Sequence, residues 1–441
     1  MKNAWSKCSW RNFQAQQQPE WKDVKHLNET ISKLNNLPAL VFSGETRRLK
    51  RELTEVNKGN SFILQVGNCA ESFSDCNGPK IHNFLRIVLQ MTRVIEFQAN
   101  KNVVKIGRIA GQYAKPRSSD SEVLNGINFP VYRGDNVNDY SPSIEGREAN
   151  ADRLLEGYFR SAATLNLIRA FTQGGYGDIQ NLSDWKRHFF SNEISNLEYY
   201  KNFERNVTNS LFFNKKKKPS ISPRGDLIYT SHEALLLDYE EAFARIDTTT
   251  GDYYSTSAHL LWIGDRTRQV DGAHVEFARG IGNPIGIKVG PTYSLKELIH
   301  IINKINPFNE EGKIILINRM GVKFIDSGLR PLIREVKKNK LKVIWSCDPM
   351  HGNTFSHEGY KVRSFEDIVS EIKSFFEICK EEKVVPGGIH LEITGEYVTE
   401  CIGGLNGLTF SNLSDNYDTK VDPRLNAAQA LEIAFIISTL I

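Results

Sequence analysis

Short apolar runs that recur along the chain constrain its fold more than any other feature. Buried parallel strands read as such near-continuous apolar runs. Segments with apolar residues at three- and four-residue spacing lie between several of the runs, as expected of helices at 294–305, 329–339 and 365–380. This alternation predicts an α/β fold, a (β/α)8 TIM barrel. Its eight strands are expected at 62–66, 103–106, 227–229, 259–263, 285–289, 313–317, 341–345 and 388–391.

Two parts of the chain fall outside this alternation. Residues 1–60 are expected to form an N-terminal extension packed outside the barrel, and residues 61–441 the catalytic barrel itself. Between the second and third strands we expect a helical insertion at about 151–225, with helices over 154–171 and 185–213. The length of 441 residues is compatible with a single large α/β barrel.

Composition excludes several classes of protein. The formal net charge of +4 is small for this length, which argues against a nucleic-acid partner. No apolar stretch reaches the roughly 18 residues of a membrane helix, so we expect no membrane partner. The N-terminus carries neither a signal-peptide nor a transit-peptide pattern. Six scattered cysteines without CxxC spacing fit a reducing compartment, and we therefore expect a cytoplasmic protein.

Charged side chains follow the predicted strands, and in a barrel those positions meet at the C-terminal mouth. Four of them are cations that suit phosphate or carboxylate groups, namely Arg108, Arg266, Lys288 and Arg319. Packed together they would repel one another, so we expect an anionic ligand to compensate them. Further basic residues at 115–117 and 361–363 would serve two phosphate-bearing groups better than one.

A second set of residues has the chemistry of metal ligands. It combines a thiol, an imidazole and two carboxylates: Cys69, His351, Glu392 and Asp422. Such a mixed set suits Mn, Co, Fe or Zn better than Mg or Ca. Because the four lie on distant segments, their spacing alone leaves open whether they meet.

Long motifs resemble the class II (plant-type) 3-deoxy-D-arabino-heptulosonate 7-phosphate (DAHP) synthases over essentially the whole chain. They include VVKIGRIAGQYAKPRSS (103–119), YRGDNVN (132–138), SHEALLLDYE (231–240), TRQVDGAHVEFARGIGNPIGIKVGP (267–291), CDPMHGNT (347–354), PGGIHLEITGEYVTECIGG (386–404) and DPRLN (422–426). The resemblance implies that phosphoenolpyruvate condenses with erythrose 4-phosphate in the first step of the shikimate pathway. It also implies a homodimer or homotetramer.

Site residues follow from the same resemblance, motif by motif. It implies the metal ligands Cys69, His351, Glu392 and Asp422, with Mn2+ or Co2+ favoured and Fe2+, Zn2+ or Cd2+ also compatible. Phosphoenolpyruvate would contact Arg108, Glu233, Trp262, Asp265, Arg266, Lys288 and Arg319. Erythrose 4-phosphate would contact Lys115, Arg117, Ser118 and Lys361, and the catalytic group would comprise Cys69, Lys288, His351, Asp265 and Arg266.

The resemblance also implies a mechanism. The metal would act as a Lewis acid on the aldehyde, and the cations would position both anions. Cys69 would have to bind as a thiolate, which an electropositive setting would favour. Inhibition by aromatic amino acids through residues 1–60 and 151–225 and simple packing of these segments are both open interpretations.

Three positions depart from the family pattern. Asn68 replaces the aspartate usual before the metal-binding cysteine, Asp265 replaces a glutamate, and Val421 replaces a cysteine that could pair with Cys69. If the carboxylate at 265 orients the attacking water, a shift of about 1 Å could cost on the order of 10²-fold in rate. Two alternatives therefore stay open: a divergent synthase that makes an analogue such as aminoDAHP, and a non-catalytic regulatory homologue.

Overall fold

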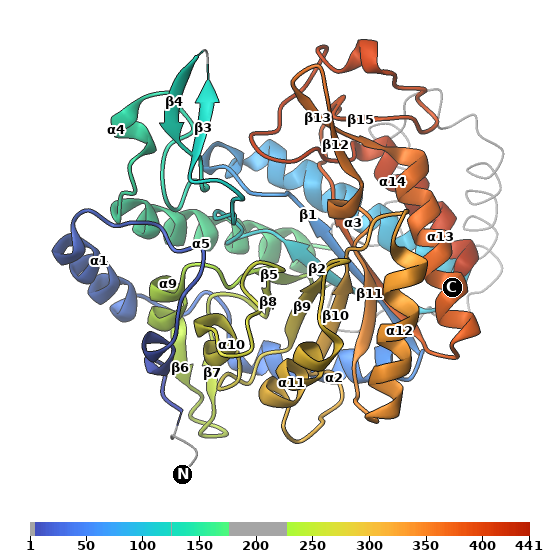
Figure 1. The fold of residues 1–441 in the computed structure, drawn as a ribbon, viewed down its shortest axis with the longest axis horizontal. Coiled ribbons are helices and arrows are strands. Elements are labelled where there is room, and N and C mark those ends of the chain that lie inside the picture. The colour runs from blue at the N-terminus through green and yellow to red at the C-terminus, as the bar shows by residue number, and fades with distance from the viewer. Residues whose placement is uncertain (1–4, 125, 176–226) are drawn as a thin grey trace.

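A computed structural model describes residues 5–124, 126–175 and 227–441, and its centre is a closed parallel barrel (Figure 1). The eight barrel strands occur in the order β1-β14-β11-β10-β9-β8-β5-β2 around the ring. Their bounds are β1 Ser61–Gly67, β2 Asn102–Arg108, β5 Tyr229–Glu233, β8 Leu260–Ile263, β9 Ile285–Val289, β10 Ile314–Asn318, β11 Ile344–Cys347 and β14 Pro386–Glu392. The predicted (β/α)8 barrel is therefore confirmed.

The third strand differs most from its predicted position. It was expected at 227–229, but β5 begins at Tyr229 and runs through polar residues to Glu233. Ser231 is accommodated inside the barrel because its hydroxyl accepts a hydrogen bond from Gln65 and donates to the carbonyl of Gly107. Such internal partners are invisible in an apolar pattern, so the strand was placed too early.

Helices cover the outside of the barrel (Figure 1). Those expected near 294–305, 329–339 and 365–380 are observed as α11 Leu295–Ile305, α12 Ile325–Lys338 and α13 Phe365–Glu381. The layer also includes α3 Gly78–Ala99, α5 Asp152–Gln173, α9 Leu237–Phe243, α10 Ala273–Ala278 and α14 Ala427–Leu440. Within the described residues, no helix has both the length and the apolar character needed to cross a membrane.

The N-terminal segment does more than lie outside the barrel. It forms α1 Val24–Asn36 and α2 Ser43–Asn57. Leu49, Leu53 and Val56 of α2 are fully buried and pack with inward-facing residues of the barrel strands. Helix α2 thus closes the end of the barrel at which the strands begin, and the opposite end is left for chemistry.

Two excursions from the barrel lie on the side of the strand ends. Strand β2 is followed by a hairpin, β3 Ser121–Leu124 and β4 Ile127–Pro130, then by α4 Ile144–Arg147 and α5. A second small sheet contains β12 Thr354–His357, β13 Tyr360–Ser364 and β15 Cys401–Ile402. A third small sheet pairs β6 Ala244–Ile246 with β7 Tyr253–Ser255. It precedes β8 and lies at the opposite end of the barrel, where Asp247 pairs with Arg47 of α2. The helix expected at 185–213 falls outside the described residues.

Candidate active site

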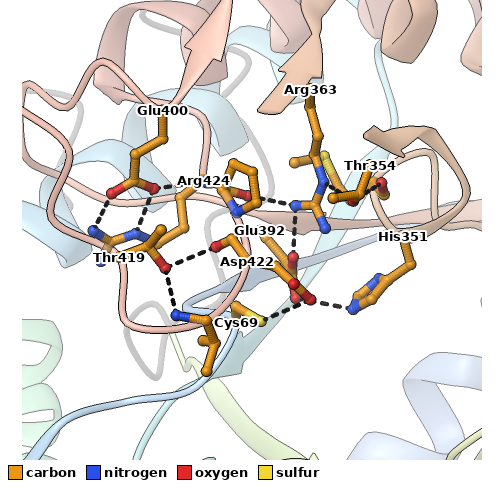
Figure 2. Close-up of polar contacts among 12 residues, drawn as sticks. Cys69, His351, Thr354, Arg363, Glu392, Glu400, Thr419, Asp422 and Arg424 are labelled. Carbon is orange, nitrogen blue, oxygen red and sulfur yellow. Dashed lines mark hydrogen bonds and ion pairs between the residues drawn. The ribbon is translucent and has the colours of Figure 1, made fainter. Parts of the chain in front are cut away.

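Four side chains that are far apart in the sequence meet beyond the ends of the barrel strands. Cys69, His351, Glu392 and Asp422 each offer a ligand atom, and these atoms lie within 4.8 Å of one another. Cys69 follows β1, His351 follows β11 and Glu392 ends β14, whereas Asp422 comes from the loop before α14. Figure 2 shows the thiol, the imidazole and the two carboxylates turned toward a common point.

Glu392 is held in this cluster by two buried arginines. Arg363 Nη1 lies 2.6 Å from Oε2 (Figure 2). Arg108 Nη2 lies 2.9 Å from Oε1. Burial by itself would raise the pKa of Glu392, but the contacts with His351, Arg363 and Arg108 outweigh it and hold that pKa well below its usual range. Glu392 therefore stays ionised although it is fully buried.

Asp422 is surrounded by two lysines. Lys361 Nζ lies 2.7 Å from its Oδ1, and Lys115 Nζ contacts both Oδ2 and the sulfur of Cys69. These cations overcome the effect of burial and keep the pKa of Asp422 well below normal. Lys115 and Lys361, expected to bind erythrose 4-phosphate, thus contact a member of the four-residue cluster directly.

His351 is oriented by a carboxylate behind it. Asp348 Oδ2 lies 2.7 Å from His351 Nδ1, which leaves Nε2 facing Glu392 Oε1 at 3.0 Å. Lys288 Nζ donates to the same Asp348 oxygen at 3.0 Å. Burial lowers the pKa of His351, which favours the neutral imidazole that ligates metals. Carboxylate–histidine pairs of this kind are typical supports of metal sites.

The thiol of Cys69 behaves differently from what the sequence suggested. Burial is the main cause that raises its pKa, to about 12, and the charges of Glu392 and Asp422 add to it. Lys115 and Arg108 act in the opposite direction but do not prevail. The expectation that the electropositive setting favours the thiolate is therefore wrong for the protein on its own, and a bound cation has to displace the proton.

Asp265 lies in a separate group of charges at the mouth of the barrel. Its Oδ2 accepts from Arg319 Nη1 at 3.1 Å, and its Oδ1 accepts from Arg268 Nε at 3.0 Å and from the backbone N–H of Gly290 at 3.1 Å. Asp265 is thus fixed at three points. Arg268, which the sequence did not single out, supplies one of them.

Arg266 does not join this group. Its side chain is exposed, and within the described part of the chain it forms no ion pair. The turn after β8 directs Asp265 toward Arg319, and the next residue consequently points away. Of the four predicted cations, Arg108, Lys288 and Arg319 each pair with a carboxylate, so the protein itself already compensates part of their charge.

Glu233 and Trp262 lie deeper in the mouth. Burial raises the pKa of the Glu233 carboxyl, although Lys288, Lys115 and Arg108 oppose the shift. A Cβ on Gly264 would lie 2.1 Å from Glu233 Oε1, so a larger residue there would displace this carboxyl. The Trp262 ring contacts the guanidinium of Arg108 at 5.2 Å and the ammonium of Lys288 at 5.6 Å from its centroid.

Arg117 and Ser118 lie farther out, after β2. Ser118 is exposed, and Arg117 pairs with Glu122 at 3.3 Å. The backbone N–H of Arg117 donates to the side chain of Gln17 at 2.7 Å, so the N-terminal segment reaches this loop. The structure therefore brings Lys115 and Lys361 to the cluster but leaves Arg117 and Ser118 at its edge.

Several supporting residues were missed by sequence reasoning or, like Arg363, were expected only as basic residues for a phosphate group. Arg363 is fully buried and also donates from Nε to Thr354 at 2.8 Å. Arg424 contacts Glu400 at 2.6 Å and the side-chain oxygen of Asn68 at 3.1 Å. The change from aspartate to Asn68 thus keeps a hydrogen-bond acceptor for Arg424 while it removes a charge. Asp348 could have been found, because a carboxylate three residues before a histidine ligand is a plausible partner.

The donor set fits a divalent transition metal. One sulfur, one nitrogen and two carboxylate oxygens form a borderline-soft set with four potential ligands. Both carboxylates are ionised and the imidazole is oriented by Asp348, so only the thiol must lose a proton. Around this set lie Lys115, Lys288, Arg108 and Arg319. A barrel whose mouth combines these features defines a metal-dependent enzyme for small anionic substrates.

Comparison with known proteins identifies the family. The model of the "Class-II DAHP synthetase family" matches residues 5–438. A phospho-2-dehydro-3-deoxyheptonate aldolase of Streptomyces coelicolor is 43% identical over 98% of this chain and 96% of its own. A phospho-2-dehydro-3-deoxyheptonate aldolase of Neurospora crassa is 42% identical, over 98% of this chain and 94% of the relative. The solved structure of a phospho-2-dehydro-3-deoxyheptonate aldolase of Thermotoga maritima aligns with a TM-score of 0.36 and 13% identity. The alignment covers 87% of this chain and 69% of the Thermotoga chain. The chain belongs to the class-II DAHP synthetase family.

Proposed function

We propose that this chain condenses phosphoenolpyruvate with erythrose 4-phosphate to give DAHP and inorganic phosphate, the entry step to chorismate and the aromatic amino acids. It is a 3-deoxy-7-phosphoheptulonate synthase, and thus a transferase. The observation that carries this proposal is the convergence of Cys69, His351, Glu392 and Asp422 beside four cations at the barrel mouth. Family membership supports the same reaction.

The reaction makes one carbon–carbon bond and releases phosphate. C3 of phosphoenolpyruvate attacks the aldehyde carbon, water adds at C2, and the C2–O bond to the phosphate breaks. Cys69, His351, Glu392 and Asp422 would hold a divalent metal, which would supply Lewis-acid polarisation of the aldehyde oxygen. We assign Mn2+ or Co2+ as the favoured ions, because the ligand set is mixed, while Fe2+, Zn2+ and Cd2+ are also compatible with it.

The residues of the chain divide into two groups. Arg108, Lys288 and Arg319 hold the phosphoenolpyruvate carboxylate and phosphate, together with Arg266 if its exposed side chain turns inward on binding. Holding both substrates in reacting geometry can contribute roughly 7–11 kcal/mol to the barrier reduction. Lys115, Arg117, Ser118 and Lys361 receive the phosphate of erythrose 4-phosphate.

Glu233 is the group best suited to exchange a proton during the reaction. Its raised pKa allows it to carry a proton closer to neutral pH than an ordinary carboxyl does. The aldehyde oxygen gains a proton when it becomes a hydroxyl, and Glu233 lies among the same cations that hold the substrates. Asp265 stays beside Arg319 and is the carboxylate placed to orient water at C2.

A phosphate-release assay tests the proposal. We expect turnover with both substrates and Mn2+, loss of turnover after chelation, and recovery with Mn2+ or Co2+. The shorter carboxylate at Asp265 and the neutral Asn68 favour one alternative, a synthase for an altered aldose phosphate such as the precursor of aminoDAHP. Turnover with an amino-substituted or imino-substituted aldose phosphate but none with erythrose 4-phosphate would establish that alternative instead.

We infer further that the enzyme works in the cytoplasm and assembles as a homodimer or homotetramer. The location follows from the scattered free cysteines and from substrates of central metabolism. Light scattering of the purified chain tests the oligomeric state, and a monomer at micromolar concentration would contradict this inference.

A further inference from the structure

A buried carboxylate on helix α13 joins two loops of the mouth. Glu371 is fully buried and lies outside the four-residue cluster. Its Oε1 accepts a hydrogen bond from the backbone N–H of Gly321 at 2.9 Å, in the loop after β10. Its Oε2 accepts from the side-chain amide of Asn353 at 2.6 Å, in the loop after β11. One carboxyl thus receives a bond from each loop.

Asn353 extends the connection between the same two loops. Its side-chain oxygen accepts from the backbone N–H of Val322 at 2.9 Å, and its amide also donates to the carbonyl of Pro349 at 2.8 Å. Both hydrogen-bonding atoms of this side chain are therefore used. The backbone hydrogen bonds between β10 and β11 stop at the ends of these strands, and beyond them the Glu371–Asn353 pair connects the two loops.

The two loops also touch through their backbones. Gly321 has a φ of +80°, and a Cβ there would lie 2.7 Å from the carbonyl oxygen of Gly352. A Cβ on Gly352 would in turn lie 2.3 Å from the nitrogen of Gly321. Two glycines facing each other in this way allow backbone-to-backbone packing that no other residue permits. The separation of the loops is therefore fixed closely at this point.

Each loop carries a residue of the proposed reaction. The first begins with Arg319, which contacts Asp265, and the second carries Asp348 and His351. Arg319 belongs to the group assigned to phosphoenolpyruvate, and His351 belongs to the ligand set. Geometry within about 0.5 Å matters for such constellations. A group that fixes one loop against the other therefore affects both halves of the site.

We propose that Glu371 is a positioning residue that sets the distance between the phosphoenolpyruvate-binding loop and the metal-binding loop. This inference rests on the proposed function, since it assigns Arg319 and His351 their roles. Burial raises the pKa of Glu371 to about 8, so the carboxyl can be neutral near pH 7 and still accept at both oxygens. No charge on Glu371 is needed for the effect.

The test compares three variants of the full-length protein. Glu371→Ala removes both acceptors, Glu371→Gln keeps one, and Glu377→Ala on the exposed face of the same helix serves as a matched control. Calorimetry gives the dissociation constants of Mn2+ and of phosphoenolpyruvate, and steady-state kinetics gives the KM of erythrose 4-phosphate. We expect Glu371→Ala to weaken Mn2+ and phosphoenolpyruvate binding each by about 10-fold, in the range that supporting residues of metal sites contribute.

The KM of erythrose 4-phosphate distinguishes a positioning role of Glu371 from a general destabilisation of the protein. Lys115, Arg117 and Ser118 lie on the loop after β2, and only Lys361 follows the metal-binding loop, so the KM of erythrose 4-phosphate should change less than the two dissociation constants. Glu371→Gln keeps an acceptor for only one of the two donors and should therefore recover part of the loss, and Glu377→Ala should match the wild type. If Glu371→Ala proves insoluble, Asn353→Ala tests the same connection from the other loop.

Two results would overturn the inference. One is binding of Mn2+ and phosphoenolpyruvate by Glu371→Ala within twofold of the wild type. The other is an equal change in all three constants, which would indicate general destabilisation. A wild-type protein that does not bind phosphoenolpyruvate at all would instead refute the proposed function, so the two failures are distinguishable.

Discussion

Asp348→Asn provides a sharp test of the proposed metal centre, because it changes one atom in a buried position. Asp348 is fully buried and accepts from His351 Nδ1, from Lys288 and from the backbone N–H of Met350. Burial would raise the pKa of Asp348, but His351 and Lys288 hold it well below the usual value. The native residue is therefore ionised, and asparagine removes a charge with little change of shape.

Both consequences of this change weaken metal binding. In the wild type the Asp348 carboxylate fixes His351 with the proton on Nδ1, which leaves Nε2 free to face Glu392 and a metal. An amide nitrogen at the Oδ2 position would repel that proton and also the Lys288 ammonium. His351 would then favour the proton on Nε2, the atom that has to ligate. Loss of one negative charge near a divalent cation acts in the same direction.

The expected loss is about 10- to 100-fold in metal affinity, the usual effect of removing such a carboxylate. This corresponds to roughly 1.4–2.7 kcal/mol, since a tenfold change equals about 1.4 kcal/mol. Competition with a fluorescent chelator measures the dissociation constant of Mn2+ for the purified variant. The exposed pair of Asp271 with Lys304 offers a control, Asp271→Asn, which should leave the constant unchanged. Affinity of Asp348→Asn within twofold of the wild type would refute the reasoning.

Three further changes should have distinct signatures. Burial lowers the pKa of Lys313 to about 7 from 10.5, so the unfolded chain binds an additional proton between these values. The unfolding free energy of the wild type relative to Lys313→Met should therefore rise with pH from 7 to 10, by at most about 1.4 kcal/mol per pH unit, in urea titrations; a flat difference would contradict this. Gln17→Ala removes the acceptor for the Arg117 N–H and should raise the KM of erythrose 4-phosphate by about 2- to 10-fold while the KM of phosphoenolpyruvate is unchanged, an effect that steady-state kinetics would detect. Gly321→Ala introduces a Cβ at a φ of +80° and should lower the unfolding free energy by more than about 1 kcal/mol, as thermal unfolding would show; an unchanged midpoint would argue against the tight loop packing.

The fold was readable because strands of a parallel barrel are buried on both faces. Runs such as 285–289 and 313–317 are apolar except for one lysine each, and the ammonium groups of these lysines have partners inside the protein. Strands β9 and β10 occur at these two runs. The run at 227–229 was the exception, because β5 contains polar residues that are satisfied only by the folded barrel. Periodicity alone cannot anticipate such partners.

The site was less accessible to sequence reasoning than the fold. Cys69, His351 and Glu392 follow or end strands, so their meeting could be expected from barrel topology. Asp422 lies on a loop after β14, so its carboxylate suggested a ligand but barrel topology did not place it with the other three. Arg363 was expected to serve a phosphate group, but it contacts Glu392, 29 positions away. Glu371 contacts Gly321, 50 positions away, and nothing in the local sequence distinguishes it from an ordinary surface charge. Arg266 shows the converse, because a charge beside a strand end can still point away.

The charge balance of the mouth explains how one site can hold a metal and two phosphorylated substrates. Five cations contact its buried carboxylates, namely Arg108, Arg363, Lys115, Lys361 and Lys288, whereas the carboxylates are three, Glu392, Asp422 and Asp348. An excess of positive charge therefore remains even before a divalent cation binds, and ionisation of the Cys69 thiol removes only part of what that cation adds. Because each cation already has a partner, anionic substrates exchange one set of ion pairs for another. Binding then depends on the positions of these cations more than on net charge, which is why the residues that fix the loops matter as much as those that touch the substrates.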